Sequence, residues 1–82
     1  MNPEELREVI EEAFGDAHVE VTGDGRHFSA IVASDAFAGK TMIAQHRMVY
    51  AALGRRFDSE EVHALSLKTF TLEQWQAQQA SP

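Results

Sequence analysis

The chain has 82 residues, of which 44% are hydrophobic and 24% charged, with a formal net charge of −6 and no cysteine. This composition is typical of one small globular domain, and it excludes a disulfide framework, a thiol nucleophile or a thiolate metal site formed by this chain alone. The acidic balance argues against non-specific binding of nucleic acid, which needs clustered Lys and Arg, but a local basic patch is still compatible with it.

No apolar run approaches the roughly 20 residues that a membrane-spanning helix needs. The N-terminus is acidic and helical in character rather than signal-like. We therefore expect a cytoplasmic protein with no membrane association.

The N-terminal segment predicts an amphipathic helix. Asn2 can cap it, Pro3 suits the first helical position, and Glu5 completes a capping-box pattern with Asn2. Apolar residues at three- and four-residue steps over 6–14 give one buried face, and Gly15 ends the helix.

Two strands joined by a hairpin come next. Val19 and Val21 alternate with polar neighbours, and the sequence Gly23-Asp24-Gly25 reads as a tight turn, because glycine accepts the positive φ of such turns. The second strand runs from Arg26 to about Ala33. One of its faces carries Phe28, Ala30 and Val32, and the other carries His27, Ser29 and Ile31.

A helical pattern then precedes one more strand. Ser34 and Asp35 predict a short helical turn, and a longer helix runs from Thr41 to about Arg56. The predicted buried stripe of that helix is Met42, Ile43, His46, Val49, Tyr50 and Leu53. The third strand spans 62–70, and a second capping pattern over 71–74 opens a terminal helix.

The predicted order is therefore α-β-β-α-α-β-α. So few elements pack most simply as an α+β domain, with a three-stranded sheet and helices on one face. We expect a single domain over 1–82, with its core at about 3–77 and a frayed tail at 78–82.

The candidate chemistry rests on histidines. No nucleophile–base pair is visible, so we do not expect an enzyme. Of the four histidines, we interpret His18 as a surface residue and His46 as a packed structural one. His27 follows the hairpin turn and His63 begins the third strand, so the two could form a pair. Two neutral imidazoles make half of a metal site, and without cysteine the other half would be external.

Two long stretches carry a family resemblance. SDAFAGKTMIAQHRMVYAAL, residues 34–53, and VHALSLKTFTLEQW, residues 62–75, closely resemble the BolA family. The family pattern S-x-x-F-x-G…R-H-R-x-V-Y…H-A-L-S-L is matched almost throughout, with Gln45 where many members have arginine. The hairpin VTGDGRHF resembles the branch typified by the bacterial protein IbaG, also called YrbA.

The resemblance implies a class II KH-like fold and a partner, a monothiol glutaredoxin of the CGFS type. In this family the pair can share a bridging [2Fe–2S] cluster, with sulfur ligands from the glutaredoxin cysteine and glutathione. The family's invariant histidine matches His63, and its hairpin ligand matches His27. The resemblance thus implies an adaptor in iron–sulfur cluster trafficking and iron homeostasis, and we expect the isolated chain to be metal-free. His46 matches a family histidine that we interpret as structural.

The KH-like fold also implies an alternative, a transcriptional regulator that binds DNA. Its candidate residues are Phe37 and Gly39 of the F-x-G segment, with Lys40 and Arg47 beside them; Arg55 and Arg56 could add to the patch. KH domains clamp the nucleic-acid backbone with a G-x-x-G loop, whereas the sequence from Gly39 here reads GKTM and has one glycine.

Overall fold

The computed structural model describes residues 2–24, 27–54 and 64–80. Its element order agrees with the predicted α+β arrangement, and the short turn after the second strand is a 3-10 helix. The elements are α1 (Pro3–Phe14), β1 (His18–Gly23), β2 (His27–Ala33), η1 (Asp35–Phe37), α2 (Met42–Leu53), β3 (Ala64–Phe70) and α4 (Leu72–Ala80).

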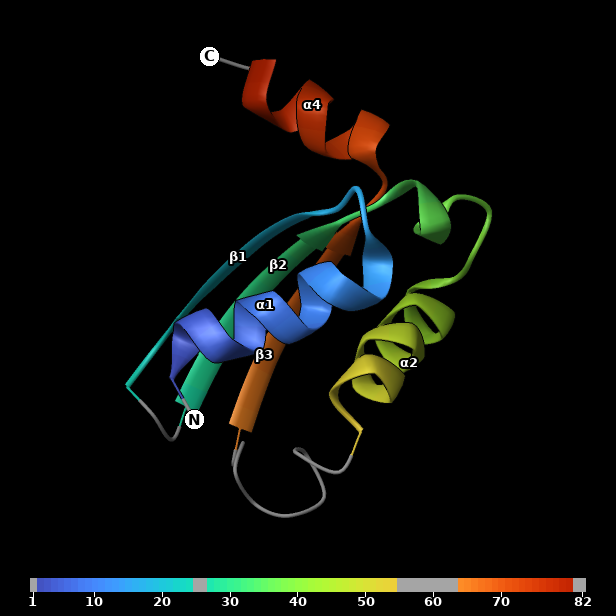
Figure 1. The fold of residues 1–82 in the computed structure, drawn as a ribbon. Helices are drawn as coiled ribbons and strands as arrows, with labels where there is room; N and C mark the ends of the chain where they lie inside the picture. Colours follow the sequence, from blue (N-terminus) through green and yellow to red (C-terminus); the bar gives the residue numbers. More distant parts are fainter. Residues whose placement is uncertain (1, 25–26, 55–63, 81–82) are drawn as a thin grey trace.

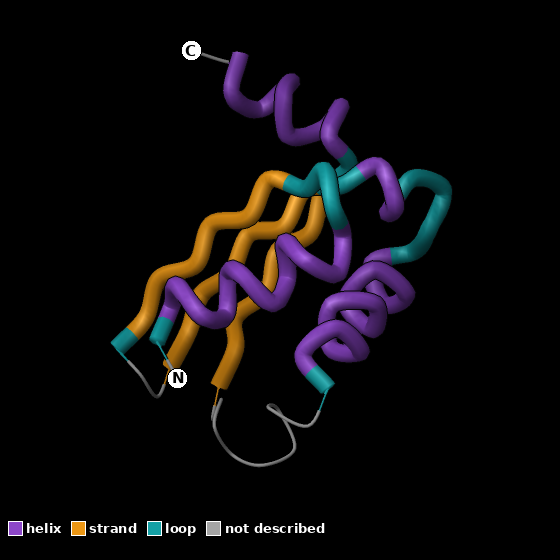
Figure 2. Tube along the Cα trace, in the orientation of Figure 1, coloured by secondary structure: helices purple, strands orange, loops and turns teal. Residues whose placement is uncertain are grey.

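The three strands form one mixed sheet in the order β1-β2-β3. β1 and β2 pair antiparallel as the predicted hairpin, whereas β2 and β3 pair parallel. Parallel neighbours need a long crossover connection, and the segment that contains η1 and α2 provides it. Figures 1 and 2 show α1 and α2 side by side on one face of the sheet, with α4 beyond the end at which β3 finishes.

The core lies between that face and the two helices. Phe37 of η1 contributes the largest fully buried side chain, and its ring meets Phe14 of α1 edge-on, with centroids 5.2 Å apart and planes at 62°. The buried cluster is Leu6, Ile10, Val19, Phe28, Val32, Phe37, Val49 and Leu53. Burial of these apolar side chains is the main contribution to stability in a domain of this size.

The helix ends follow the predicted capping chemistry. Asn2 Oδ1 accepts the Glu5 backbone N–H at 2.8 Å, and the Asn2 side-chain amide donates to Glu5 Oε1 at 3.2 Å. At α4, Thr71 Oγ1 accepts the Gln74 N–H at 3.1 Å, and the Thr71 N–H donates to Gln74 Oε1 at 3.0 Å. Both ends are capping boxes in which the side chains satisfy backbone groups that a helix leaves unpaired.

The predicted stripe of α2 is wrong at its first turn. Met42 and Ile43 are 69% and 66% exposed, whereas Val49 and Leu53 are fully buried. His46 and Tyr50 are half-buried. The spacing is helical, as expected, but a helical residue is buried only where another element covers it, and the core meets the C-terminal half of α2.

The last helix is attached to the end of the sheet by aromatic contacts. The Trp75 indole stacks on the His18 imidazole, with centroids 4.8 Å apart and planes at 26°, and lies 5.7 Å from the Phe70 ring. α4 continues to Ala80, three residues past the predicted end of the core at 77. None of the helices in the described segments has the length and apolarity that crossing a bilayer requires.

Candidate functional site

The hairpin end of the sheet is built around Asp24 and His27. The Asp24 N–H donates to the His27 carbonyl at 3.2 Å, and the His27 N–H donates to Asp24 Oδ1 at 2.9 Å. Two bonds between the same two residues close the turn. The side chain of Asp24 thus supplies the local structure that fixes the backbone of His27.

Gly23 is needed at this turn for a different reason from the one predicted. It is not among the glycines with positive φ, but a Cβ there would lie 2.6 Å from the His27 carbonyl oxygen and 2.7 Å from Phe28 Cδ1. Close approach of the two strand ends, rather than a left-handed backbone, therefore requires glycine. Gly25, the second glycine of the predicted turn, lies outside the described residues.

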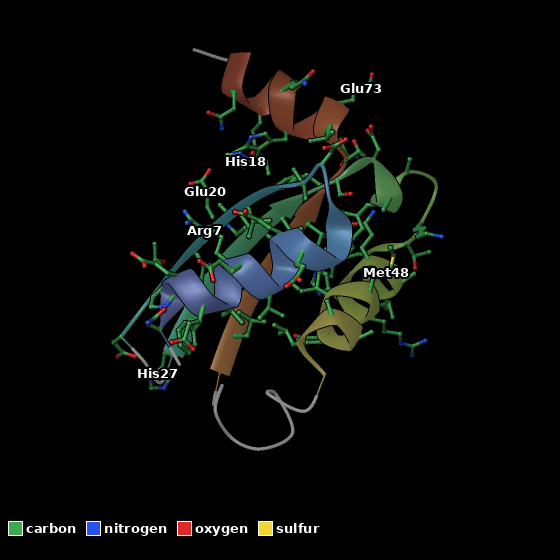
Figure 3. All side chains as sticks on the ribbon, viewed as in Figure 1. Arg7, His18, Glu20, His27, Met48 and Glu73 are labelled. Atoms are coloured by element: carbon green, nitrogen blue, oxygen red, sulfur yellow. The ribbon has the colours of Figure 1, made fainter. Side chains whose placement is uncertain are left out.

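The side chain of His27 stands out from the sheet. It alternates with the buried Phe28, and its side chain is 73% exposed. Its Nδ1 lies 3.8 Å from Asp24 Oδ2. Figure 3 shows His27 at the end of the sheet opposite to α4. With 73% of its side chain exposed, the imidazole is accessible to solvent.

The strand register brings the start of β3 to the same place. The parallel pairing of β2 with β3 begins with His27 opposite Ala64, and paired strands lie about 4.8 Å apart. Ala64 follows His63 directly in the sequence. His63, the other predicted ligand, is itself outside the described residues.

The other two histidines have structural surroundings. His18 Nε2 lies 2.6 Å from Glu20 Oε2, and its ring is stacked on Trp75. The expected surface position is confirmed, since the side chain is 44% exposed. His46 is half-buried on α2. Neither histidine lies in the turn that holds His27.

A complete metal site is not formed by the described residues. Within 2–24, 27–54 and 64–80, no three groups from His, Cys, Asp and Glu gather closely enough to hold a metal ion. The chain also has no cysteine. His27 can offer one nitrogen ligand, so sulfur ligands would have to come from another molecule.

The loop predicted for nucleic-acid binding presents fewer groups than expected. Phe37 is 0% exposed and belongs to the core, so its ring is not accessible to a ligand in this structure, and its predicted contact with nucleic acid stays a prediction. Gly39 has a φ of +74°, and Lys40 and Arg47 are exposed. Of the four candidate residues, the last three are exposed to solvent.

Gln45 holds this loop in place. Its side-chain amide donates to the carbonyls of Phe37 at 3.1 Å and Lys40 at 3.0 Å, and its Oε1 accepts the Thr69 hydroxyl at 2.6 Å. One glutamine therefore ties the loop to both α2 and β3. In the sequence it stands out only as a departure from the family pattern, and its three partners could not be read from the spacing.

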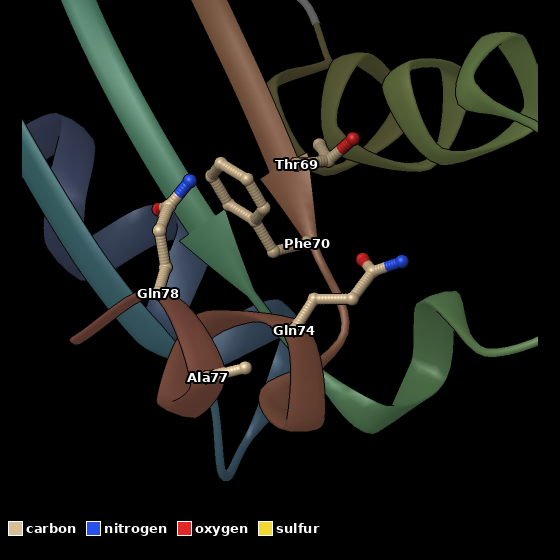
Figure 4. Close-up of a pocket in the computed structure, with 5 residues that line it drawn as sticks. All are labelled: Thr69, Phe70, Gln74, Ala77 and Gln78. Carbon is tan, nitrogen blue, oxygen red and sulfur yellow. The ribbon is translucent and has the colours of Figure 1, made fainter. Parts of the chain in front are cut away.

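Two open grooves were not predicted. The larger, of about 530 Å³, lies between the end of β3 and α4 and is lined by Thr69, Phe70, Gln74, Ala77 and Gln78 (Figure 4). The smaller, of about 220 Å³, lies over β2 and β3 and is lined by Ser29, Ala30, Ile31, Ser66, Leu67 and Lys68. Of these two grooves, only the smaller is lined by a charged residue, Lys68.

The fold and the site together define a class of protein. It is a small α+β domain with a mixed three-stranded sheet and an exposed histidine at the hairpin end. Residues 1–74 match the model of the family described as BolA-like protein. The chain therefore belongs to the BolA-like family.

Known relatives agree with this assignment. The chain is 31% identical over 75 residues to the acid stress protein IbaG of Escherichia coli, covering 92% of this chain and 89% of IbaG. It is 36% identical over 72 residues to the DNA-binding transcriptional regulator BolA of the same species, covering 88% and 66% of the two chains. A BolA homologue from Coxiella burnetii has a similar structure, with a TM-score of 0.83 and 38% identity over 93% of this chain and 97% of that one.

Proposed function

We propose that this protein is a non-catalytic adaptor that binds a monothiol glutaredoxin and shares a bridging [2Fe–2S] cluster with it. In this proposal His27 and His63 are the ligands from this chain, and the glutaredoxin cysteine and glutathione supply sulfur. The role would be in cluster trafficking or iron homeostasis. Family membership supports a BolA-type role in general. The finer assignment is what the family resemblance implies, and the exposed His27 is compatible with it.

The observation that carries the proposal is the strand register. His27 pairs with Ala64, the residue that follows His63 in the sequence. An exposed imidazole at the open end of a sheet is accessible to a docked partner, and the chemistry of the donors fits. Imidazole binds iron in clusters where histidine replaces cysteine, and the missing cysteines make an external thiolate necessary.

When bound, such a cluster would supply one-electron redox chemistry and an iron–sulfur unit that can be passed on. Neutral imidazole in place of thiolate raises the reduction potential of a cluster. It also makes ligation sensitive to acid, because a protonated imidazole has no lone pair for iron. The residues of this chain would therefore favour a labile cluster over a permanent one.

The test is reconstitution with a monothiol glutaredoxin, glutathione, iron and sulfide. The mixture should give an absorption and circular dichroism spectrum that differs from that of the glutaredoxin homodimer. His27→Ala and His63→Ala should each remove the difference, whereas His18→Ala should keep it. A wild-type mixture whose spectrum equals that of glutaredoxin alone would refute the proposal.

A second candidate function is DNA binding, the activity in the name of the Escherichia coli BolA. Exposed Lys40 and Arg47 near the loop support it. Lys40→Ala and Arg47→Ala should then weaken binding at about 50 mM salt, and each lost phosphate contact should reduce the salt dependence of the binding constant. Absence of binding at that salt concentration would exclude this role.

A further inference from the structure

We propose that Asp24 is a positioning residue that directs Nε2 of His27 toward the metal. The proposal rests on the function proposed above and concerns how this chain prepares one of the two ligands. It is based on the different contacts of the two carboxylate oxygens of Asp24. One holds the backbone of His27 and the other faces the imidazole ring.

The contacts are specific to the two atoms. Asp24 Oδ1 accepts the backbone N–H of His27 at 2.9 Å, which sets the orientation of the carboxylate. Oδ2 is then 3.8 Å from Nδ1 of the same histidine. At 3.8 Å the two atoms are just beyond hydrogen-bond range, and a small rotation of the exposed imidazole would bring them within it.

A carboxylate beside Nδ1 favours the tautomer in which Nδ1 carries the proton. The lone pair is then on Nε2, the nitrogen farther from the backbone. Metal-binding histidines commonly have such a carboxylate or carbonyl at the second ring nitrogen, which fixes the tautomer and makes the ligand more basic. Within the part of the chain that the structure describes, no hydrogen bond engages Nε2 of His27.

The other histidine–carboxylate pair has the opposite arrangement. In His18 it is Nε2 that meets the carboxylate of Glu20, at 2.6 Å, and the ring is stacked on Trp75. That histidine has its outer nitrogen occupied and one ring face covered. A carboxylate near histidine is therefore not sufficient for ligand preparation, and the proposal depends on which nitrogen it faces.

Asp24→Asn is the decisive substitution. The asparagine Oδ1 can still accept the His27 N–H and so preserve the turn, but an NH₂ group replaces the oxygen that faces Nδ1. A donor in that position disfavours the Nδ1–H tautomer. Glu20→Gln is the matched control, since it makes the same change of charge beside His18. Asp24→Ser, which keeps a capping oxygen but has no second one, is the reserve variant if the asparagine protein does not fold.

The first measurement uses the free protein. Nitrogen-15 NMR of the imidazole side chains at about pH 8.5, where histidine is neutral, reports the tautomers. We expect His27 to favour Nδ1–H in the wild type and Nε2–H in Asp24→Asn, with Glu20→Gln leaving His27 unchanged. An unchanged His27 tautomer in Asp24→Asn would overturn the inference.

The second measurement uses the reconstituted complex with glutaredoxin and glutathione. Loss of a partner that orients a metal ligand typically weakens metal binding about 10- to 100-fold, so Asp24→Asn should release the cluster to a chelator correspondingly faster and change its midpoint potential. If Asp24→Asn retains the cluster as long as the wild type does and has the same midpoint potential, the inference is overturned. The proposed function still stands in that case, provided that His27→Ala changes the spectrum. If His27→Ala changes nothing, the proposed function itself fails.

Discussion

The imidazole of His18 and the indole of Trp75 are stacked, with ring centroids 4.8 Å apart and planes at 26°. His18 opens β1 and Trp75 lies in α4, so this contact joins the first strand to the last helix. Glu20 holds the outer nitrogen of the same imidazole at 2.6 Å. The position of α4 therefore depends on a side chain that is distant in the sequence.

Substitution of His18 should release the indole. Trp75 is the single tryptophan, so its fluorescence reports α4 alone. In His18→Ala we expect emission to shift to longer wavelength, with a loss of stability of about 0.5–1.5 kcal/mol, the usual contribution of an aromatic pair. His27→Ala is the matched control, because His27 is at the other end of the sheet. Equal spectra for the two variants would show that the stacking does not hold α4.

The stability of the protein should depend on the side-chain amide of Gln45. Gln45→Glu keeps an oxygen for the Thr69 hydroxyl but removes the amide donor to the carbonyls of Phe37 and Lys40. The Phe37 carbonyl still accepts the Lys40 N–H at 3.1 Å. We expect urea denaturation to show a loss of about 1–2 kcal/mol, the net contribution of the two hydrogen bonds that are lost. Gln76→Glu on the exposed side of α4 is the control and should stay within about 0.5 kcal/mol of wild type. Equal stability of the two variants would contradict this role of Gln45.

The sequence predicts those features that depend on neighbours in the chain. The capping boxes at Asn2 and Thr71 need only a partner three residues away, and both are present. The alternation of β2 likewise indicates the correct buried face, with Phe28, Ala30 and Val32 inside. Local hydrogen bonding and periodicity depend only on residues that are close in the sequence, so these elements can be found without knowledge of the fold.

The features that the sequence does not predict depend on which elements meet. The sequence places Phe37 in a binding loop, although η1 turns it into the core against Phe14. It places Met42 in a buried stripe whose first turn is uncovered. For the candidate site, the position after the turn identifies His27, but its pairing with Ala64 and the orientation of Asp24 follow from register and side-chain geometry.

The first turn of α2 should tolerate polar residues. Because Met42 and Ile43 are exposed, Met42→Ser and Ile43→Ser should each change the free energy of unfolding by no more than about 0.5 kcal/mol. Leu53→Ala, in the buried half of the same helix, should cost about 2–5 kcal/mol. Thermal and urea unfolding of the three variants measures this contrast. A large loss in Ile43→Ser would mean that the first turn is covered in solution.

The close approach of the strands at Gly23 leaves no space for a side chain at this position. In Gly23→Ala the added methyl would collide with the His27 carbonyl and the Phe28 ring, at 2.6 and 2.7 Å. The backbone carbonyl cannot move without breaking its bond from the Asp24 N–H. We therefore expect the hairpin end to open, with a loss of about 1–3 kcal/mol, the usual cost of overpacking.

Hydrogen exchange can locate that change. The amide of His27, which is bonded to Asp24 Oδ1, should exchange faster in Gly23→Ala, while the amides of α1 should change only as much as global stability dictates. Gly15→Ala is the control: its φ is +69° and an added methyl would meet nothing within 4 Å, so its strain is confined to the end of α1. If both variants protect the His27 amide equally, the steric role of Gly23 is wrong, and the turn is set by Asp24 alone.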